Sequence, residues 1–272
     1  MNYRHAFHAG NHADVFKHAA LTLALEHLRQ KPQPFAVLDT HAGLGVYDLT
    51  SEEAQRSPEF QEGVGKIFGR ELQAAPAYSQ LVAAMNPDGL TAYPGSPEIV
   101  RAFLREGDRL AACELHPDDV RVLKARYRDD RQVAVHHRDG YEAVGALLPP
   151  PERRGLVFID PPFEKTDETQ RLIASMTAGL KRWPVGVFMA WYPAKDGKAG
   201  AALSAAAAGF PKALRVEFSP FLWEENSLPG SGLLICNAPW KLDEKLAALC
   251  AELSGLLGGG HARWTIDQLT PG

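Results

Sequence analysis

The sequence predicts a doubly wound α/β fold, in which a mainly parallel sheet is covered by helices on both faces. Strand-like and helix-like segments alternate from residue 109 onward, which is the pattern of repeated strand–helix–strand units. The strand-like segments are apolar throughout, as expected for strands that are buried on both faces. Polar residues follow directly after several of these segments, and ligands of such sheets bind at the carboxyl ends of the strands.

The first helix and the first strand come before a glycine-containing turn. Apolar residues recur at helical spacing over residues 11–29, and two prolines shortly afterwards end that helix. Residues 35–39 then predict a short buried strand. The tight turn that follows, residues 40–45, contains two glycines that let the backbone approach a ligand closely.

Residues 47–93 differ from the rest of the chain and predict a helical insertion subdomain. Helix-like pieces at residues 60–68 and 77–85 are separated by prolines, and no segment between them resembles a strand. The remaining residues, 1–46 and 94–272, are expected to form one domain around the sheet.

A further helix is expected to begin near Ser96. That serine suits the N-cap, Pro97 suits the first helical position, and Glu98 is favourable next to the helix dipole. The remaining strands are predicted at residues 109–115, 132–137, 155–159, 186–192, 213–218 and 232–237. The remaining helices are predicted at residues 117–127, 141–147, 168–183, 195–208 and 241–257.

The composition is that of a globular protein with one sizeable core. Of the 272 residues, 45% are hydrophobic and 23% are charged. The net charge of −4 does not indicate a nucleic-acid-binding protein, although a local basic face is compatible with it. Cys113, Cys236 and Cys250 lack CxxC spacing and fit a reducing compartment. With no secretory pattern and no long apolar run, we expect a cytoplasmic protein, and a monomer.

The run Asp160-Pro161-Pro162-Phe163 is the most informative part of the chain. Two prolines directly after a buried strand end the sheet and remove two backbone donors. The turn would then group a carboxylate, backbone carbonyls and an aromatic face around one small space, which suits a planar base with an amino group. This element, D-P-P followed by an aromatic residue, is typical of amino-methyltransferases that use S-adenosylmethionine. An ordinary strand-ending turn is the alternative.

Three other acids also follow predicted strands, so all four are expected at one edge of the sheet. Glu114 can accept both hydroxyls of a ribose, and capping of the next helix is its alternative role. Asp139 and Gly140 can present a carboxylate to the adenine amine of a cofactor, with an N-cap role again as the alternative. Asp39 ends the first strand.

Several blocks of the sequence together resemble one known family. They are residues 3–15 (YRHAFHAGNHADV), 38–43 (LDTHAG), 93–97 (YPGSP), 114–117 (ELHP), 160–163 (DPPF) and 239–242 (PWKL). The chain is similar, nearly end to end, to the bacterial 23S ribosomal RNA adenine-N6 methyltransferases of the ribosomal large subunit methyltransferase J family. That resemblance implies a class I methyltransferase fold with an early helical insertion. It also implies methyl transfer from S-adenosylmethionine to N6 of one adenine in 23S ribosomal RNA.

The resemblance also implies roles for individual residues. Asp160 would be the catalytic acceptor, and Tyr3 would lie near the RNA. The residues expected to contact the cofactor are His18, His41, Ser96, Glu114, Asp139, Gly140 and Asp160. From the chemistry of the turn, the Pro161 carbonyl and the Phe163 ring are expected to hold the target base. The family pattern usually has tyrosine at the last position, so Phe163 can stack but lacks a hydroxyl.

Other polar residues have simpler expected roles. His8 and His12 have i, i+4 spacing but lack any zinc-binding context, so no metal is expected. Lys17 is expected to be a solvated lysine, and approach to the cofactor is the alternative. The basic run at residues 121–131 is expected to be a solvated face, with RNA contact as the alternative, and residues 153–154 are slightly better candidates for phosphate contact.

Three other functions remain open from the residues alone. A guanine-N2 or DNA adenine-N6 methyltransferase would carry the same strand-end acids. A non-catalytic module that binds RNA or cofactor is disfavoured by the intact Asp160. A nicotinamide dehydrogenase is disfavoured because G-x-G-x-x-G is absent.

Overall fold

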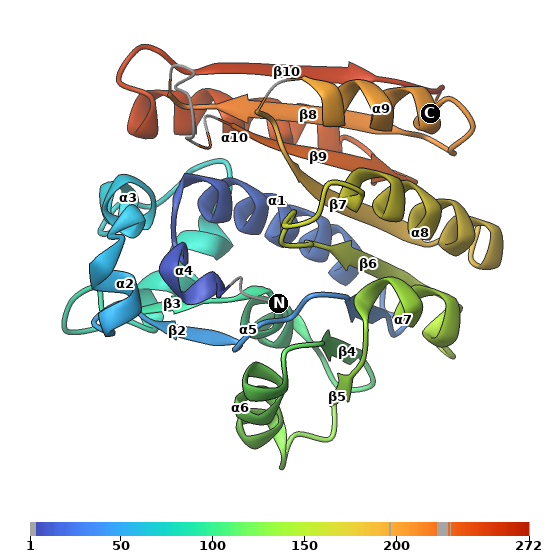
Figure 1. The fold of residues 1–272 in the computed structure, drawn as a ribbon, viewed down its shortest axis with the longest axis horizontal. Coiled ribbons are helices and arrows are strands. Elements are labelled where there is room, and N and C mark those ends of the chain that lie inside the picture. The colour runs from blue at the N-terminus through green and yellow to red at the C-terminus, as the bar shows by residue number, and fades with distance from the viewer. Residues whose placement is uncertain (1–3, 196, 222–227, 229, 272) are drawn as a thin grey trace.

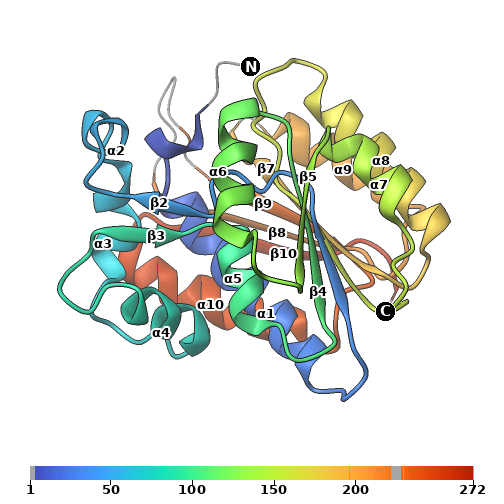
Figure 2. The ribbon, with the colours of Figure 1, turned by 90° about the horizontal axis from the view of Figure 1, so that it is seen from below.

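The protein contains one large sheet with helices on both faces (Figures 1 and 2). The computed structural model describes residues 4–195, 197–221, 228 and 230–271. The strands of the large sheet are β1 (Ala36–Asp39), β4 (Arg109–Glu114), β5 (Val133–His137), β6 (Gly155–Ile159), β7 (Val187–Pro193), β8 (Leu214–Ser219), β9 (Ser231–Cys236) and β10 (Arg263–Gln268). Among the described residues, their order in the sheet is β10-β8-β9-β7-β6-β1-β4-β5.

The strand directions confirm the predicted doubly wound fold and add an antiparallel part. Strands β7, β6, β1, β4 and β5 run parallel to one another. Strand β9 lies antiparallel between β7 and β8, and β10 pairs antiparallel with β8 at the edge. The seven strands predicted for this sheet agree with the structure to within one residue at each end. The edge strand β10 was not predicted.

The helices form one layer on each face of the sheet. They are α1 (His12–Arg29), α5 (Ser96–Phe103), α6 (Pro117–Tyr127), α7 (Gly140–Leu147), α8 (Glu168–Arg182), α9 (Lys198–Ala207) and α10 (Leu242–Leu257). Figure 2 shows α1, α5, α6 and α10 on one face and α7, α8 and α9 on the other. Two clusters of buried apolar side chains, one on each face, pack these helices against the sheet. None of the helices in the described part of the chain could span a membrane.

Helix α1 is unusual because it is buried almost all round. Asn11 caps it by accepting the Asp14 N–H at 3.0 Å, and the helix packs against α4 (Pro76–Ala84), α5 and α10. A helix that is buried on every side is normally apolar. Helix α1 nevertheless carries buried Asp14, Lys17 and His18. These polar side chains therefore need partners inside the protein.

The residues between β1 and α5 contain short helices and a second, small sheet. Strand β2 (Val46–Asp48) pairs antiparallel with β3 (Ala92–Pro94), so the expectation that this segment contains no strand is wrong. Three-residue strands are too short to give a period-2 pattern. Between them lie α2 (Glu52–Arg56), the 3-10 helix η2 (Glu59–Glu62), α3 (Val64–Ile67) and α4. A second 3-10 helix, η1 (His5–Phe7), precedes α1.

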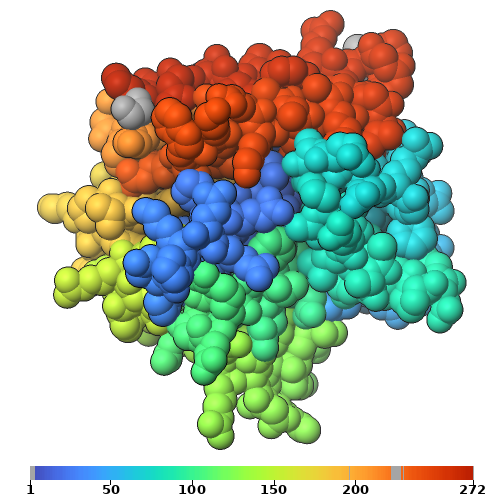
Figure 3. Space-filling model, turned by 180° about the vertical axis from the view of Figure 1, so that it is seen from behind, coloured from blue at the N-terminus to red at the C-terminus, as the bar shows by residue number. Residues whose placement is uncertain are grey.

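The inserted helices are fixed to the main body at two places. Glu252 of α10 accepts the backbone N–H groups of Gln73 and Ala74, both at 2.8 Å. Helix α3 also contacts α10, and α4 contacts α1. Figure 3 shows the inserted region (cyan to teal) directly beside α1 (blue) and α10 (orange-red).

Helix α5 starts one residue earlier than the sequence predicted. Gly95 is the N-cap, and Ser96 is already the first helical residue with Pro97 behind it. The prediction that Ser96 caps the helix is therefore wrong. Its hydroxyl is left for contacts at the carboxyl end of the sheet.

Candidate active site

Four acidic residues lie at the carboxyl edge of the parallel strands. Asp39 ends β1 and Glu114 ends β4, while Asp139 follows β5 and Asp160 follows β6. These strands are parallel neighbours, and Asp39 is in register with Ala112 of β4 and Phe158 of β6. The prediction that the four acids share one edge is therefore confirmed. We call them the strand-end acids.

Asp160 is held by a buried lysine from α1. Lys17 Nζ lies 2.6 Å from Asp160 Oδ2 and 2.8 Å from Asp14 Oδ1. The Lys17 side chain is only 4% exposed, so the expectation of a solvated lysine is wrong. On the other side of Asp14, His5 Nε2 lies 2.9 Å from Oδ2. One cation thus bridges two buried carboxylates, which are the partners that a buried charge requires.

The electrostatics of the two carboxylates differ. Burial raises the pKa of Asp160, and the Lys17 cation only partly opposes it. Burial also raises the pKa of Asp14, but the charges of His5 and Lys17 outweigh it and hold that pKa well below its usual range. Asp14 is therefore an anion at neutral pH that fixes Lys17. Asp160 is the carboxylate whose charge state can respond to its surroundings.

The aromatic residue after the two prolines packs beside this pair. Phe163 has a left-handed backbone conformation (φ 50°), and its ring meets Trp191 of β7 edge-on at 5.7 Å between centroids. Lys17 Nζ lies over the same Trp191 ring, 5.1 Å from its centroid. Trp191 donates from Nε1 to Ser231 Oγ, which fixes the indole. Lys17 and Trp191 thus connect Asp160 to Phe163 through successive contacts.

Asp39 is the most deeply buried of the strand-end acids. Its Oδ1 accepts the His41 N–H at 3.4 Å, and among the described residues no donor reaches Oδ2 in hydrogen-bond geometry. Burial raises its pKa to about 7, the nearby Ser96 hydroxyl lowers it, and the Asp160 charge raises it. A buried carboxylate oxygen without a donor is costly. Asp39 Oδ2 is therefore a candidate acceptor for a donor on a bound ligand.

Glu114 organises the glycine turn after β1. Its Oε2 accepts the Gly43 N–H at 2.8 Å and its Oε1 accepts the His116 N–H at 2.7 Å. Burial raises its pKa, while the bonds from His116 and Gly43 lower it. Gly43 has φ +61°, in the left-handed region that glycine adopts without strain. Each oxygen keeps an unused lone pair for a ligand hydroxyl.

Asp139 is the N-cap of α7. Its Oδ1 accepts the N–H groups of Tyr141 at 2.8 Å and Glu142 at 3.4 Å, so the capping role considered from the sequence is present. Gly140 is required by packing, because a Cβ there would lie 2.1 Å from the carbonyl oxygen of Thr40. The turn after β1 and the start of α7 therefore touch through their backbones.

The two predicted cofactor histidines have different surroundings. His41 packs edge-on against Tyr141 at 5.2 Å between centroids, and burial lowers its pKa to about 4. His18 is hydrogen-bonded through Nδ1 to the Tyr93 hydroxyl at 2.9 Å, and burial lowers its pKa to about 3. Both rings are neutral at pH 7. His41 lies beside Asp139, whereas the described polar contact of His18 points toward the inserted region.

The remaining residues considered from the sequence are those expected near the RNA or a metal ion. Tyr3 lies outside the described residues. Arg154 donates to the carbonyls of Leu28 and Gln33 at the amino end of β6, opposite to Asp160, and the phosphate contact expected for residues 153–154 stays a prediction. In the basic run on α6, Arg121 pairs with Asp118. Among the described residues, no group of histidines, cysteines and acids could hold a metal ion.

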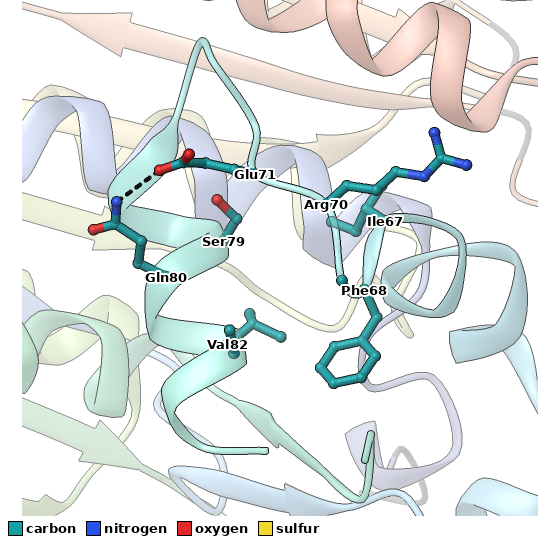
Figure 4. Close-up of a pocket in the computed structure, with 9 residues that line it drawn as sticks. Ile67, Phe68, Arg70, Glu71, Ser79, Gln80 and Val82 are labelled. Carbon is teal, nitrogen blue, oxygen red and sulfur yellow. Dashed lines mark hydrogen bonds between the residues drawn. The ribbon is translucent and has the colours of Figure 1, made fainter. Parts of the chain in front are cut away.

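Two pockets lie away from the strand-end acids. One, of about 230 Å³, is formed by α3, α4 and the loop between them (Figure 4). Its rim includes Glu71 and Gln80, which form the hydrogen bond drawn there at 2.8 Å. The other, of about 200 Å³, lies at the amino ends of β1 and β4, on the edge opposite to the site. Neither pocket contains one of the strand-end acids.

The comparisons with known proteins agree with this arrangement. Residues 32–270 match the family model described as "Ribosomal RNA large subunit methyltransferase D, RlmJ". The chain belongs to the RlmJ family. Ribosomal RNA large subunit methyltransferase J of Escherichia coli K12 is 38% identical over 100% of this chain and 99% of its own length. The protein of the same name from Haemophilus influenzae is 36% identical over the same shares.

A solved structure extends the likeness to the fold. Protein LPL1258 from Legionella pneumophila is 31% identical, with a TM-score of 0.90 over 96% of this chain and 98% of its own. The family prediction is thus confirmed. As a member of the RlmJ family, the chain is an S-adenosylmethionine-dependent methyltransferase with a Rossmann-like fold, as the sequence predicted.

Proposed function

We propose that this RlmJ-family enzyme transfers the methyl group of S-adenosylmethionine to N6 of one adenine in 23S ribosomal RNA, with Asp160 as the catalytic acceptor. The observation that carries this proposal is the position of Asp160. It lies at the carboxyl edge of the sheet, beside Lys17 and ahead of two prolines and Phe163. A carboxylate next to an aromatic ring suits a planar base with an exocyclic amine.

The cofactor would lie along the other strand-end acids. Asp39 offers a buried oxygen without a donor, which suits the ammonium group of a methionine moiety. Glu114 keeps acceptor capacity for the two ribose hydroxyls, and Asp139 with Gly140 and His41 lines the place of the adenine. Ser96 lies beside Asp39, and His18 is placed with the cofactor by family resemblance. These residues fit S-adenosylmethionine, whose sulfonium supplies an electrophilic methyl group.

The chain's own task is to make an aromatic amine nucleophilic. The lone pair of an adenine N6 is delocalised into the ring, so it attacks poorly. Asp160 and the Pro161 carbonyl would accept the two N–H bonds, which favours a pyramidal nitrogen and gives the proton a place to go. Lys17 holds Asp160 in position and partly opposes the rise in its pKa that burial causes. The raised pKa of Asp160 makes it a better proton acceptor than an ordinary aspartate.

The target base must leave its stack to reach this corner. Phe163 would then hold it, with a stacking energy of about 1–3 kcal/mol. In the structure the Phe163 ring rests on Trp191. Tyr3, from the N-terminal block, would approach the RNA.

Some broader features belong to the same proposal. The sulfonium makes a metal unnecessary, and the enzyme would work as a monomer in the cytoplasm, where ribosomal RNA is found in bacteria. Residues 47–93 would form a helical subdomain inserted into one domain made of residues 1–46 and 94–272. The position of the inserted helices, between β2 and β3 and against α10, supports that division.

The decisive test of the function is to identify the modified nucleoside. The enzyme is incubated with labelled S-adenosylmethionine and protein-free transcribed 23S ribosomal RNA, and the digested RNA is analysed by mass spectrometry. The expected product is N6-methyladenosine at one position. N2-methylguanosine, or label only in duplex DNA, would favour the other amino-methyltransferases, and no label would favour a binding module. RNA from cells lacking the gene should lack the same single methyl group.

A further inference from the structure

Arg171, in the first turn of α8, closes a ring of contacts beside Asp139. Its Nη2 donates to Asp139 Oδ2 at 2.9 Å, and its Nη1 donates to Glu168 Oε1 at 3.2 Å. The guanidinium lies over the Tyr141 ring, 4.4 Å from the centroid. The Tyr141 hydroxyl donates to Glu168 Oε2 at 3.2 Å, which completes the ring.

This ring fixes the carboxylate of Asp139 on both oxygens. Oδ1 accepts two backbone N–H groups at the start of α7, and Oδ2 accepts Arg171. A carboxylate has about four acceptor positions, so these three bonds leave about one. Because the occupied positions set the plane of the carboxylate, the remaining acceptor has one direction. A group that meets it must be a donor.

We propose that Arg171 is a positioning residue that makes Asp139 selective for the amino group of the cofactor's adenine. This inference rests on the proposed function, because it takes the adenine to lie at Asp139. With Arg171 in place, a 6-amino purine completes the acceptor positions of the carboxylate. A 6-keto purine would instead place a carbonyl oxygen against a carboxylate, with no donor between them.

The surroundings of the pair support a role beyond joining two helices. Arg171 and Asp139 are 31% and 22% exposed, so a ligand can reach them from solvent. Burial lowers the pKa of Arg171, whereas the hydrogen bond to Asp139 and the charge of that acid raise it. The pKa of Arg171 is raised overall. The pKa of Asp139 is lowered, because the Tyr141 N–H and Arg171 outweigh burial. The acid therefore stays a pure acceptor across the working pH range.

The test compares two product analogues that differ at one position of the purine. Dissociation constants of S-adenosylhomocysteine and S-inosylhomocysteine are measured by calorimetry on the full chain. One charge-assisted hydrogen bond corresponds to roughly a 10- to 100-fold preference, which is the ratio expected for the wild type in favour of the amino purine. In Arg171→Met, which keeps the apolar stem over Tyr141, the ratio is expected to fall by about tenfold. Arg171→Gln, which keeps some polarity, should lose the preference in the same direction.

Arg182→Met is the matched control. Arg182 lies on the same helix, and its Nε donates to the Leu148 carbonyl at 3.1 Å, far from the strand-end acids along α8. Its variant should keep the wild-type ratio and should lose stability to a degree comparable with Arg171→Met. A role of Arg171 in helix packing alone would lower both affinities equally and leave the ratio unchanged.

The outcomes separate this inference from the proposed function. If Arg171→Met and Arg171→Gln retain the wild-type ratio, Arg171 does not position Asp139 and the inference is overturned. It is overturned as well if the wild type binds both analogues equally. If the wild type binds neither analogue and methylates no RNA, the proposed function fails first. Should the Met variant not fold, the Gln variant decides by the same ratio.

Discussion

Lys17 Nζ and Asp160 Oδ2 lie 2.6 Å apart, although their side chains are only 4% and 12% exposed. This ion pair thus joins the buried helix α1 to the turn after β6 at the centre of the site. Lys17 contacts Asp14 in the same way. Removing this one cation would leave two carboxylates buried together.

Lys17→Met should therefore be costly for both folding and catalysis. Loss of a buried partner typically costs about 3–5 kcal/mol of unfolding free energy, and turnover at pH 7 should fall roughly 100-fold. Without the cation, the already raised pKa of Asp160 rises further, so more of the acid is protonated at pH 7. Residual activity should then increase toward pH 9. Lys17→Arg, which keeps the charge, should recover part of both quantities, and a Met variant with wild-type stability and rate would refute the role of the pair.

Asp39 predicts a specific dependence of stability on pH. Its pKa is raised from 3.8 to about 7, so between these values the folded protein binds a proton that the unfolded chain has lost. The contribution of Asp39 to stability is fully present below about pH 4 and is lost as the pH rises toward 7, by at most about 1.4 kcal/mol per pH unit. Asp39→Asn removes this titration. Urea unfolding is measured at pH 5, 6, 7 and 8 without cofactor. The unfolding free energy of the variant should increase relative to that of the wild type up to pH 7 and not beyond. A constant difference would mean that Asp39 is not buried as a proton-binding acid.

Glu114→Gln should weaken the binding of the cofactor rather than the binding of the RNA. The amide can no longer accept on both sides, because one oxygen that now meets a backbone N–H is replaced by an NH₂ group. Loss of charged hydrogen bonds of this kind corresponds to an increase in Kd of roughly 10- to 100-fold. Calorimetry with S-adenosylhomocysteine measures it. Glu142→Gln, an exposed acid on α7, is the control and should bind normally. Equal affinity in both variants would exclude Glu114 from the cofactor site.

Phe163→Ala should act on the RNA step. Stacking of about 1–3 kcal/mol corresponds to roughly a 5- to 150-fold loss in kcat/KM for RNA. The affinity for S-adenosylhomocysteine should change far less, because the ring contacts Trp191 rather than the strand-end acids Glu114 and Asp139. Phe163→Tyr keeps the ring and should remain near the wild type. If the alanine variant loses affinity for the cofactor and kcat/KM for RNA to the same degree, Phe163 supports the fold of the turn after β6 and does not hold the base.

The sequence predicted the central sheet well because its strands carry a strong signal. All five residues of β6 are apolar or glycine and all are buried. Strand β10 was missed because most of its residues are exposed at the sheet edge and contain no apolar run. Strands β2 and β3 are too short to show a pattern. In each case the missing information was the partner strand, which lies far away in the chain.

The site was predicted where its residues follow strands, and missed where it depends on a helix. The four strand-end acids could be placed because parallel strands end at the same edge. Lys17 could not, because a lysine on a helix is normally solvated and only Asp14 and Asp160 reveal that it is buried. Arg171 gave no signal for the same reason. The sign that was available in the sequence is the charged pair Asp14 and Lys17 among the apolar residues of α1.

The carboxylate of Asp160 is the group on which the proposed methyl transfer depends most directly. In Asp160→Ala, turnover of labelled S-adenosylmethionine on 23S ribosomal RNA should be undetectable, while the protein stays folded and still binds S-adenosylhomocysteine. Single-turnover label transfer, measured on the variant and the wild type side by side, gives the answer. Transfer within a few-fold of the wild-type rate would contradict the proposed role of Asp160 and, with it, the mechanism built around that residue.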